Sequence, residues 1–147
     1  GQRQTNADLS GTMAESKGPG ANHPAENGKR VREGRYPLAT QGFKGSKYKT
    51  WGYAKENQKG SKPGFELSVP GPRTGILVHP GIGFLASVGC LNPCTALPNE
   101  NEDISFPGSR RRVIALIEDM IEFLDGDFPK ENEMHIPRAF AVIDGEP

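Results

Sequence analysis

The chain lacks an excess of charge of either sign and lacks long apolar runs. Its 147 residues carry 18 Lys and Arg against 18 Asp and Glu, so the formal net charge is zero. Proteins that bind nucleic acid through its phosphates normally carry a basic surplus, and this balance argues against nucleic acid as a partner. No apolar run approaches the roughly 20 residues that a membrane-spanning helix needs. We therefore expect neither a nucleic-acid-binding protein nor a membrane protein.

Side chains that bind metals are also scarce. The histidines His23, His79 and His135 are scattered, and the two cysteines, Cys90 and Cys94, have no second pair. The spacings Cys-x-x-Cys and His-Glu-x-x-His are missing, as are phosphate-binding glycine motifs, so we expect no metal and no cofactor. A disulfide between the two cysteines would close a very small loop and stabilise little. The sequence therefore predicts at least one free thiol.

Hydrophobic residues make up only 34% of the chain, which contains 19 Gly and 13 Pro. Such a composition predicts many turns and few long helices. Residues 1–30 are polar, and we expect a partly disordered arm or an edge strand there, near Leu9 or Met13. Residues 31–147 are long enough for a single domain with one core.

Strand-like segments separated by turn signals follow from residue 31. Residues 47–53 and 64–69 alternate along the chain as half-buried strands do. The continuously apolar segment 74–79 is typical of a central strand buried on both faces. Residues 35–40 and 139–143 complete the expected sheet.

One amphipathic helix is expected at about residues 109–125. Ser109 is a candidate N-cap, apolar side chains recur at helical spacing as far as Leu124, and Gly126 suits the position after the helix. The arginines at 110–112 would lie at the helix N-terminus, where the helix dipole disfavours positive charge. We expect three solvated side chains there, or an anion that offsets the cost. The fold class is therefore mainly β, a sheet or sandwich-like domain with one helix.

The stretch from His79 to Cys90 has the pattern of a thiol nucleophile and its base. His79 ends the apolar strand, a glycine-rich loop follows, and Gly89 directly precedes Cys90. A thiol attacks a carbonyl as the thiolate, so a catalytic cysteine needs a base nearby. Backbone amides beside Gly89 could stabilise an oxyanion. We predict Cys90 as the nucleophile and His79 as the general base, with Ser87 supporting the loop.

This pattern resembles the L,D-transpeptidase (YkuD-like) family, whose motif is a histidine, a variable loop and then Ser/Thr-His-Gly-Cys. His79, Ser87, Gly89 and Cys90 match that motif, whereas Val88 stands at the family's second histidine. The chain is also similar to a small domain of phage and bacterial proteins of unknown function. That domain has a Gly-x-Tyr-Pro strand, a Gly-Ile-Leu-x-His strand and a Gly-Cys turn, an order that residues 34–37, 75–79 and 89–90 follow.

The resemblance covers roughly residues 29–95 and implies a β-rich enzyme that acts on peptidoglycan stem peptides. Cys90 would form a thioester that an amine or water resolves, giving a transpeptidase or a carboxypeptidase. Such a substrate implies the periplasm or secretion, although no signal peptide is visible in the chain. An exported antibacterial effector, with an immunity protein as its partner, is a related interpretation.

Candidate substrate-binding residues lie around this motif. Arg73 and the arginines at 110–112 would bind substrate carboxylates, and Asn92 stands where the family usually has an arginine. Tyr36 and Trp51 are aromatic candidates for the lining of a groove.

Two other interpretations remain open. In papain-like and NlpC/P60 hydrolases the cysteine precedes its histidine, which would pair Cys90 with His135, but Pro93 disfavours the helix that such a cysteine normally begins. A non-enzymatic binding module for the cell wall is the second, with a groove lined by Tyr36, Tyr48, Trp51 and Tyr53. Cys94 has the sequence context of a packed rather than a reactive thiol.

Overall fold

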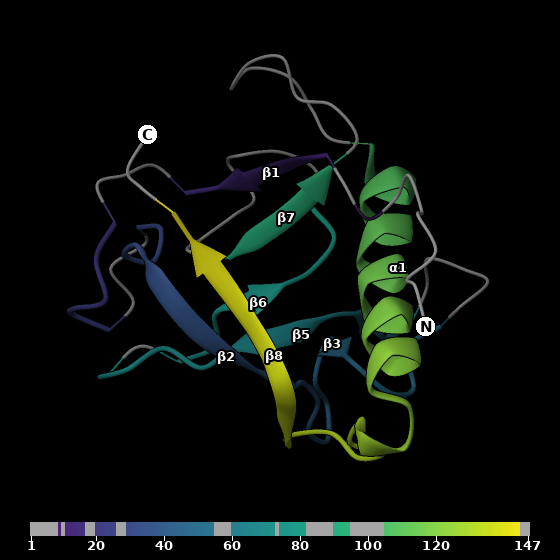
Figure 1. Cartoon of the computed structure of the whole chain (residues 1–147). Coiled ribbons are helices and arrows are strands. Elements are labelled where there is room, and N and C mark those ends of the chain that lie inside the picture. Colours follow the sequence, from purple (N-terminus) through teal and green to yellow (C-terminus); the bar gives the residue numbers. More distant parts are fainter. Residues whose placement is uncertain are drawn as a thin grey trace.

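The computed structural model describes residues 9, 11–16, 20–25, 29–54, 60–72, 74–81, 90–94 and 105–144. This part of the chain forms a six-stranded mixed sheet, a two-stranded sheet and one long helix (Figure 1). The prediction of a mainly β fold with one helix is confirmed.

The large sheet has the strand order β1-β7-β6-β5-β2-β8. Its strands are β1 (Thr12–Glu15), β2 (Gly34–Thr40), β5 (Phe65–Leu67), β6 (Leu77–Val78), β7 (Leu91–Cys94) and β8 (His135–Ile143). Neighbours are antiparallel except β6 and β7, which are parallel. The short strands β3 (Tyr48–Lys49) and β4 (Lys62–Pro63) pair in parallel as a second sheet. This order puts β1 and β8 at the two edges of the large sheet.

The observed strands lie where the sequence patterns predict them, but their lengths differ from the predicted ones. The segments at 35–40 and 139–143 are strands, and β8 begins earlier, at His135. The segments expected at 47–53, 64–69 and 74–79 each keep only a short central strand. Leu77 and Val78 are both buried between β5 and β7, as the continuously apolar run predicts.

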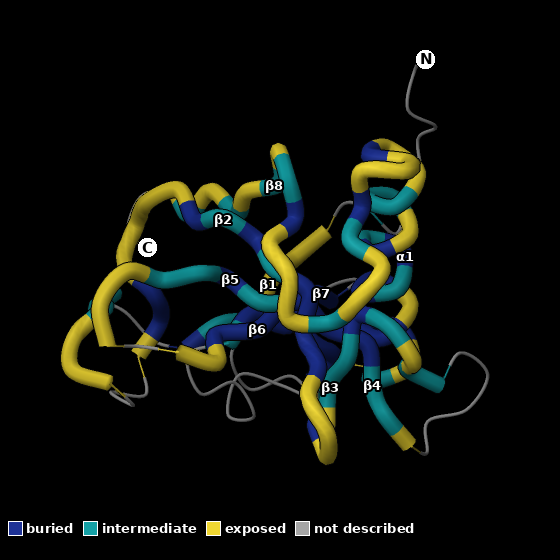
Figure 2. Tube along the Cα trace, turned by 90° about the horizontal axis from the view of Figure 1, so that it is seen from below, coloured by how far each residue is buried: buried dark blue, intermediate teal, exposed yellow. Residues whose placement is uncertain are grey.

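The register of the sheet separates its side chains into two faces. Phe65 is opposite Val78, and Val78 is opposite Leu91, so these three side chains share one face. That face belongs to the core, and Figure 2 shows the buried segments gathered around β5, β6 and β7. Side chains one position away, including His79 and Cys90, therefore point to the other face.

Helix α1 (Phe106–Leu124) begins three residues before the expected start, so the assignment of Ser109 as N-cap is wrong. Ser105 is the N-cap, and its side chain accepts a hydrogen bond from Gly108 N at 3.3 Å. Proline fits the first turn because its missing N–H would have no partner there. Pro107 is therefore accommodated in the first turn of the helix. A short 3-10 helix, η3 (Asp125–Asp127), follows α1.

Two of the three arginines at the start of α1 are buried. Arg110 is 9% exposed and donates to Ala54 O, and Arg112 is 4% exposed and lies against Gly11. The expectation that all three are solvated is wrong, because α1 begins earlier and carries Arg110 and Arg112 into packed positions. Val113 and Ile117 of the same helix are fully buried in the core.

None of the helices in the described ranges combines the length and the apolar character that crossing a bilayer requires.

Candidate functional site

Strands β6 and β7 bring His79 and Cys90 to one region of the sheet. Val78 and Leu91 are direct partners in the parallel register, and His79 N donates to Leu91 O at 3.1 Å. His79 comes directly after β6, and Cys90 comes directly before β7. Because side chains alternate along a strand, both residues point to the face opposite Val78 and Leu91. The pair that the sequence motif singled out therefore shares a sheet face in the fold.

The imidazole of His79 is held in one tautomer. The ring is buried, and its Nδ1 lies 2.7 Å from Pro80 O. A carbonyl oxygen can only accept, so Nδ1 carries the proton and Nε2 keeps its lone pair. Burial lowers the pKa of His79, and the nearby charges of Lys47 and Lys62 lower it further, while the bond to Pro80 acts in the opposite direction. His79 is thus neutral at pH 7, and Nε2, which carries the lone pair of the ring, lies 3.5 Å from Asn92 Nδ2.

Asn92 supports His79 from the adjacent strand. Its fully buried side-chain Nδ2 donates to His79 O at 2.9 Å and lies 3.4 and 3.5 Å from the two ring nitrogens. The donation to a carbonyl identifies Nδ2 and leaves Oδ1 on the other side, where it has no partner within the described part of the chain. The backbone of Gly81 lies so close to this amide that a Cβ at that position would be 2.6 Å from Asn92 Cγ. The structure thus places Asn92, one of the residues singled out from the sequence, against the predicted base.

Helix α1 anchors the strand end that carries His79. Gly81 N donates to Ser109 Oγ at 3.1 Å, and Ser109 is 1% exposed. Sequence reasoning assigned the hydroxyl of Ser109 to a helix cap, and the structure uses it to hold the backbone beside the site.

Tyr48, which the sequence offered only as a groove residue of the binding-module alternative, packs against His79. Its ring lies 4.3 Å from that of His79, centroid to centroid, with a 36° angle between the planes. Gly64 makes this contact possible, since a Cβ there would come within 3.1 Å of Tyr48 Cβ. Burial raises the pKa of Tyr48, and charge on Cys90 raises it further. No local pattern linked Tyr48 to His79, because Tyr48 lies in the two-stranded sheet and His79 follows a strand of the large sheet.

The Cys90 thiol is not in a disulfide and is partly exposed. Its Sγ accepts a hydrogen bond from Leu77 N at 3.4 Å and donates to Gly75 O at 3.6 Å. The sulfur of Cys90 is thus held against the backbone of the segment that leads into β6.

Cys94 differs from Cys90 in its surroundings. It is 1% exposed, and its Sγ donates to Thr12 O at 3.3 Å. Burial raises the pKa of Cys94, with Arg112 acting in the opposite direction. Cys94 is a packed thiol, as its sequence context predicts, and it is not disulfide-bonded to Cys90.

The aromatic candidates lie elsewhere in the fold. Tyr36 is 3% exposed on the core face of the sheet, and its hydroxyl donates to Arg32 O. Trp51 donates from Nε1 to Pro129 O at 2.7 Å and meets the ring of Phe128 edge-on. The structure places neither of them against His79 or Cys90.

Three candidates, Arg73, Ser87 and Gly89, lie outside the described residues. The papain-like alternative needs Cys90 and His135 close together. Strands β6, β5 and β2 separate β7, which Cys90 precedes, from β8, where His135 lies. Moreover, Cys90 precedes a strand, where that alternative needs a helix N-terminus.

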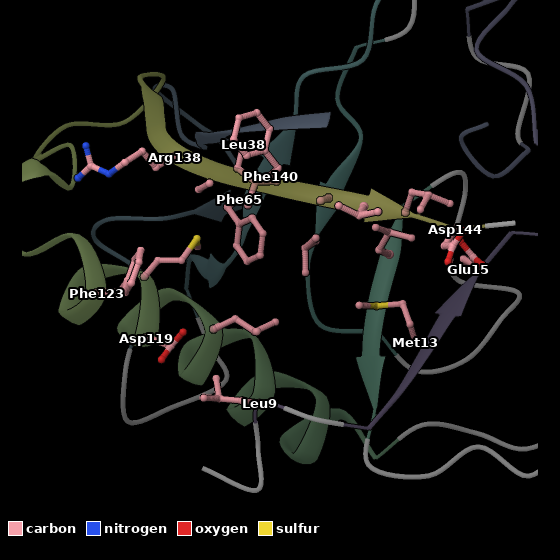
Figure 3. A pocket seen from close by; sticks show the side chains of 18 of the residues that line it. Leu9, Met13, Glu15, Leu38, Phe65, Asp119, Phe123, Arg138, Phe140 and Asp144 are labelled. Atoms are coloured by element: carbon pink, nitrogen blue, oxygen red, sulfur yellow. The ribbon is translucent and has the colours of Figure 1, made fainter. Parts of the chain in front are cut away.

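A cavity of about 730 Å³ lies between α1 and the core face of the sheet. Figure 3 shows Phe65 and Leu38 from the sheet and Phe123 from α1 around this space. Its lining includes Val78 and Leu91, the direct sequence neighbours of His79 and Cys90. The cavity is thus on the opposite side of the sheet from the two candidate catalytic side chains.

Comparison with known proteins gives no relative: no protein-family model, curated protein or solved structure matches the chain. Across the described ranges, no three His, Cys, Asp or Glu side chains are grouped to hold a metal ion.

Proposed function

We propose that the protein is a cysteine-dependent acyl-transfer enzyme of the L,D-transpeptidase or L,D-carboxypeptidase type that acts on peptidoglycan stem peptides. The observation that carries the proposal is the position of His79 and Cys90 on one face of the sheet, next to the paired residues Val78 and Leu91 of the parallel strands β6 and β7. The neutral imidazole, with its proton on Nδ1, adds the base that the thiol needs.

The first step transfers the thiol proton of Cys90 to Nε2 of His79, while Sγ attacks an amide carbonyl carbon of the stem. The new C–S bond turns the carbonyl oxygen into an oxyanion, and collapse of this intermediate breaks the C–N bond. The leaving amine takes the proton from His79. An amine or water then attacks the thioester and releases the thiol.

The residues around the pair have supporting roles in this mechanism. Asn92 and Pro80 hold the backbone and ring of His79, and the proton on Nδ1 leaves the lone pair of Nε2 to act as the base. The raised pKa of Tyr48 keeps its hydroxyl protonated at neutral pH, beside the charge that develops on Cys90. A protonated hydroxyl near a forming thiolate or oxyanion can donate to it.

The choice of substrate rests on the resemblance of His79, Ser87, Gly89 and Cys90 to the L,D-transpeptidase motif. A peptidoglycan substrate places the activity in the periplasm or outside the cell. An antibacterial effector with a cognate immunity protein would be consistent with this substrate.

The test incubates purified peptidoglycan fragments with the wild type, Cys90→Ala and the matched control Cys94→Ala, followed by mass spectrometry. We expect the wild type and Cys94→Ala to release D-alanine, trim stems or form cross-linked dimers, and Cys90→Ala to do none of these. Turnover by Cys90→Ala would overturn the proposal. If the wild type binds the fragments without converting them, and still binds after alkylation of Cys90, the binding-module interpretation replaces it.

A further inference from the structure

Strand β8 is a long edge strand with apolar side chains exposed to solvent. It has nine residues and, within the described part of the chain, pairs only with β2. Phe140 is 41% exposed and Val142 is 68% exposed, although both lie in this strand. An open edge of this kind is a template for another strand, and proteins usually interrupt it with charges. Between Ala139 and Ile143 this edge carries no charge.

The direction of the free backbone groups follows from Pro37. Its carbonyl accepts a hydrogen bond from Ser68 N at 2.8 Å, on the β5 side, and proline has no N–H. Pro37 is opposite Phe140, so this pair makes no ladder hydrogen bonds between β2 and β8. Because hydrogen-bonded and non-bonded pairs alternate, the N–H and C=O groups of Phe140 and Val142 point away from β2. These groups are positioned to bond a further strand.

The charges beside this apolar segment select its partner. Arg138 precedes the segment and Asp144 follows it, and both are exposed. We propose that β8 pairs in antiparallel fashion with β8 of a second copy of this chain, about a two-fold axis at Ala141. Phe140 is then opposite Val142 of the second copy, and Arg138 is opposite its Asp144. The axis repeats both contacts, and the outward backbone groups of Phe140 and Val142 bond each other.

Other registers lose this complementarity. Moving the axis by one residue to Phe140 places Arg138 opposite Val142, and moving it to Val142 places Asp144 opposite Phe140. Either shift buries a charge against an apolar side chain and removes both ion pairs. The axis at Ala141 therefore matches apolar with apolar and positive with negative at every outward position from 138 to 144.

The existing contact of Arg138 does not prevent this arrangement. Arg138 forms an ion pair with Asp127 at 2.7 Å, but their side chains are 61% and 64% exposed. Such solvated pairs are weak and exchange readily. Arg138 has a φ of 56°, so regular strand geometry is needed only from Ala139 onward, and the long side chain of Arg138 spans the remaining gap.

The test measures the dimer dissociation constant of the full chain by sedimentation equilibrium. We expect the wild type to dimerise and the single variants Arg138→Asp and Asp144→Arg each to weaken the dimer by about tenfold or more, because each replaces two attractive cross-strand pairs with repulsive ones. An equimolar mixture of the two single variants should dimerise like the wild type, since their charges are complementary. The double variant that carries both changes should also dimerise like the wild type.

Controls separate pairing from folding and from catalysis. Asp127→Asn should leave the dissociation constant unchanged, and Cys90→Ala should dimerise like the wild type whatever its activity. Val142→Pro removes an outward N–H without touching the β2 ladder and should abolish the dimer while circular dichroism stays unchanged. A wild type that remains monomeric, single variants that dimerise normally, or a mixture that does not recover would each overturn the proposal.

Discussion

At the scale of single residues, the candidate site depends on a histidine kept neutral by its surroundings. The protonated form of His79 is disfavoured because the ring is buried and faces the charges of Lys47 and Lys62. Its ring stays in place through Pro80 O, Asn92 and Tyr48. The sequence indicated the histidine and the cysteine, because both flank a glycine-rich loop. It did not indicate the support of the histidine by Tyr48, which no spacing rule connects to it.

The lowered pKa of His79 predicts a pH dependence of stability. Unfolded His79 binds a proton near its ordinary pKa of about 6.5, whereas folded His79 resists protonation at that pH. The contribution of His79 to the free energy of unfolding is therefore fully present above about pH 6.5. It is lost as the pH drops from there toward the pKa of His79 in the folded protein, by at most about 1.4 kcal/mol per pH unit. Urea unfolding at several pH values should show this slope in the wild type.

The variant His79→Gln should lose this part of the slope, and the control His135→Gln, at an exposed position, should keep it. An equal slope in the wild type and His79→Gln would show that His79 does not titrate as its burial indicates.

Gly64 is expected to be necessary for the contact between Tyr48 and His79. In Gly64→Ala the new methyl group would crowd Tyr48 Cβ at 3.1 Å and Val78 O at 3.2 Å. Overpacking of this kind costs about 1–3 kcal/mol. The displaced tyrosine should also alter the rate at which iodoacetamide alkylates Cys90. Chemical denaturation and the alkylation rate measure the two effects.

Gly126→Ala is the matched control, because a Cβ there meets nothing within 4 Å. If Gly64→Ala were as stable as Gly126→Ala and alkylated at the wild-type rate, Tyr48 would not depend on Gly64.

At the scale of elements, the helix shows where a local rule led to the wrong residue. The apolar spacing predicted α1 with an end at about residue 125, one residue past the observed end at Leu124, because periodicity reflects the face that packs on the core. The expected start at Ser109 is wrong, because residues 106–108, with Pro107 among them, belong to the helix. Proline is equally compatible with the first helical turn, so the true cap is Ser105.

The two serines should therefore respond differently to substitution. Ser105→Ala removes an N-cap and should cost about 1 kcal/mol. Ser109→Ala removes the buried acceptor of Gly81 N, which should cost about 1–3 kcal/mol because the N–H is left unsatisfied. Only Ser109→Ala should also raise hydrogen exchange of the Gly81 amide. Equal exchange of that amide in both variants would contradict the assignment.

At the scale of the whole molecule, the large sheet has two faces with different contents. One face, with Phe65, Val78 and Leu91, belongs to the core and lines the cavity beside α1 (Figure 3). The other face carries His79 and Cys90. The edge strands β1 and β8 lie at opposite ends of the strand order, and β8 is the edge proposed to pair with a second copy. Pairing at β8 would leave the candidate site on β6 and β7 separate from the dimer contact.

The sequence by itself determined the fold class, the positions of the main strands, the apolar face of α1 and the pair of His79 and Cys90. These features depend on composition, on side-chain alternation and on residues close together in the chain. Only the tertiary structure decided that β6 and β7 are parallel, that Tyr48 packs on His79, and that Ser109 bonds Gly81. Each of these contacts joins residues far apart in the chain. Local patterns cannot specify such contacts, because strand order and register arise from the packing of the whole sheet.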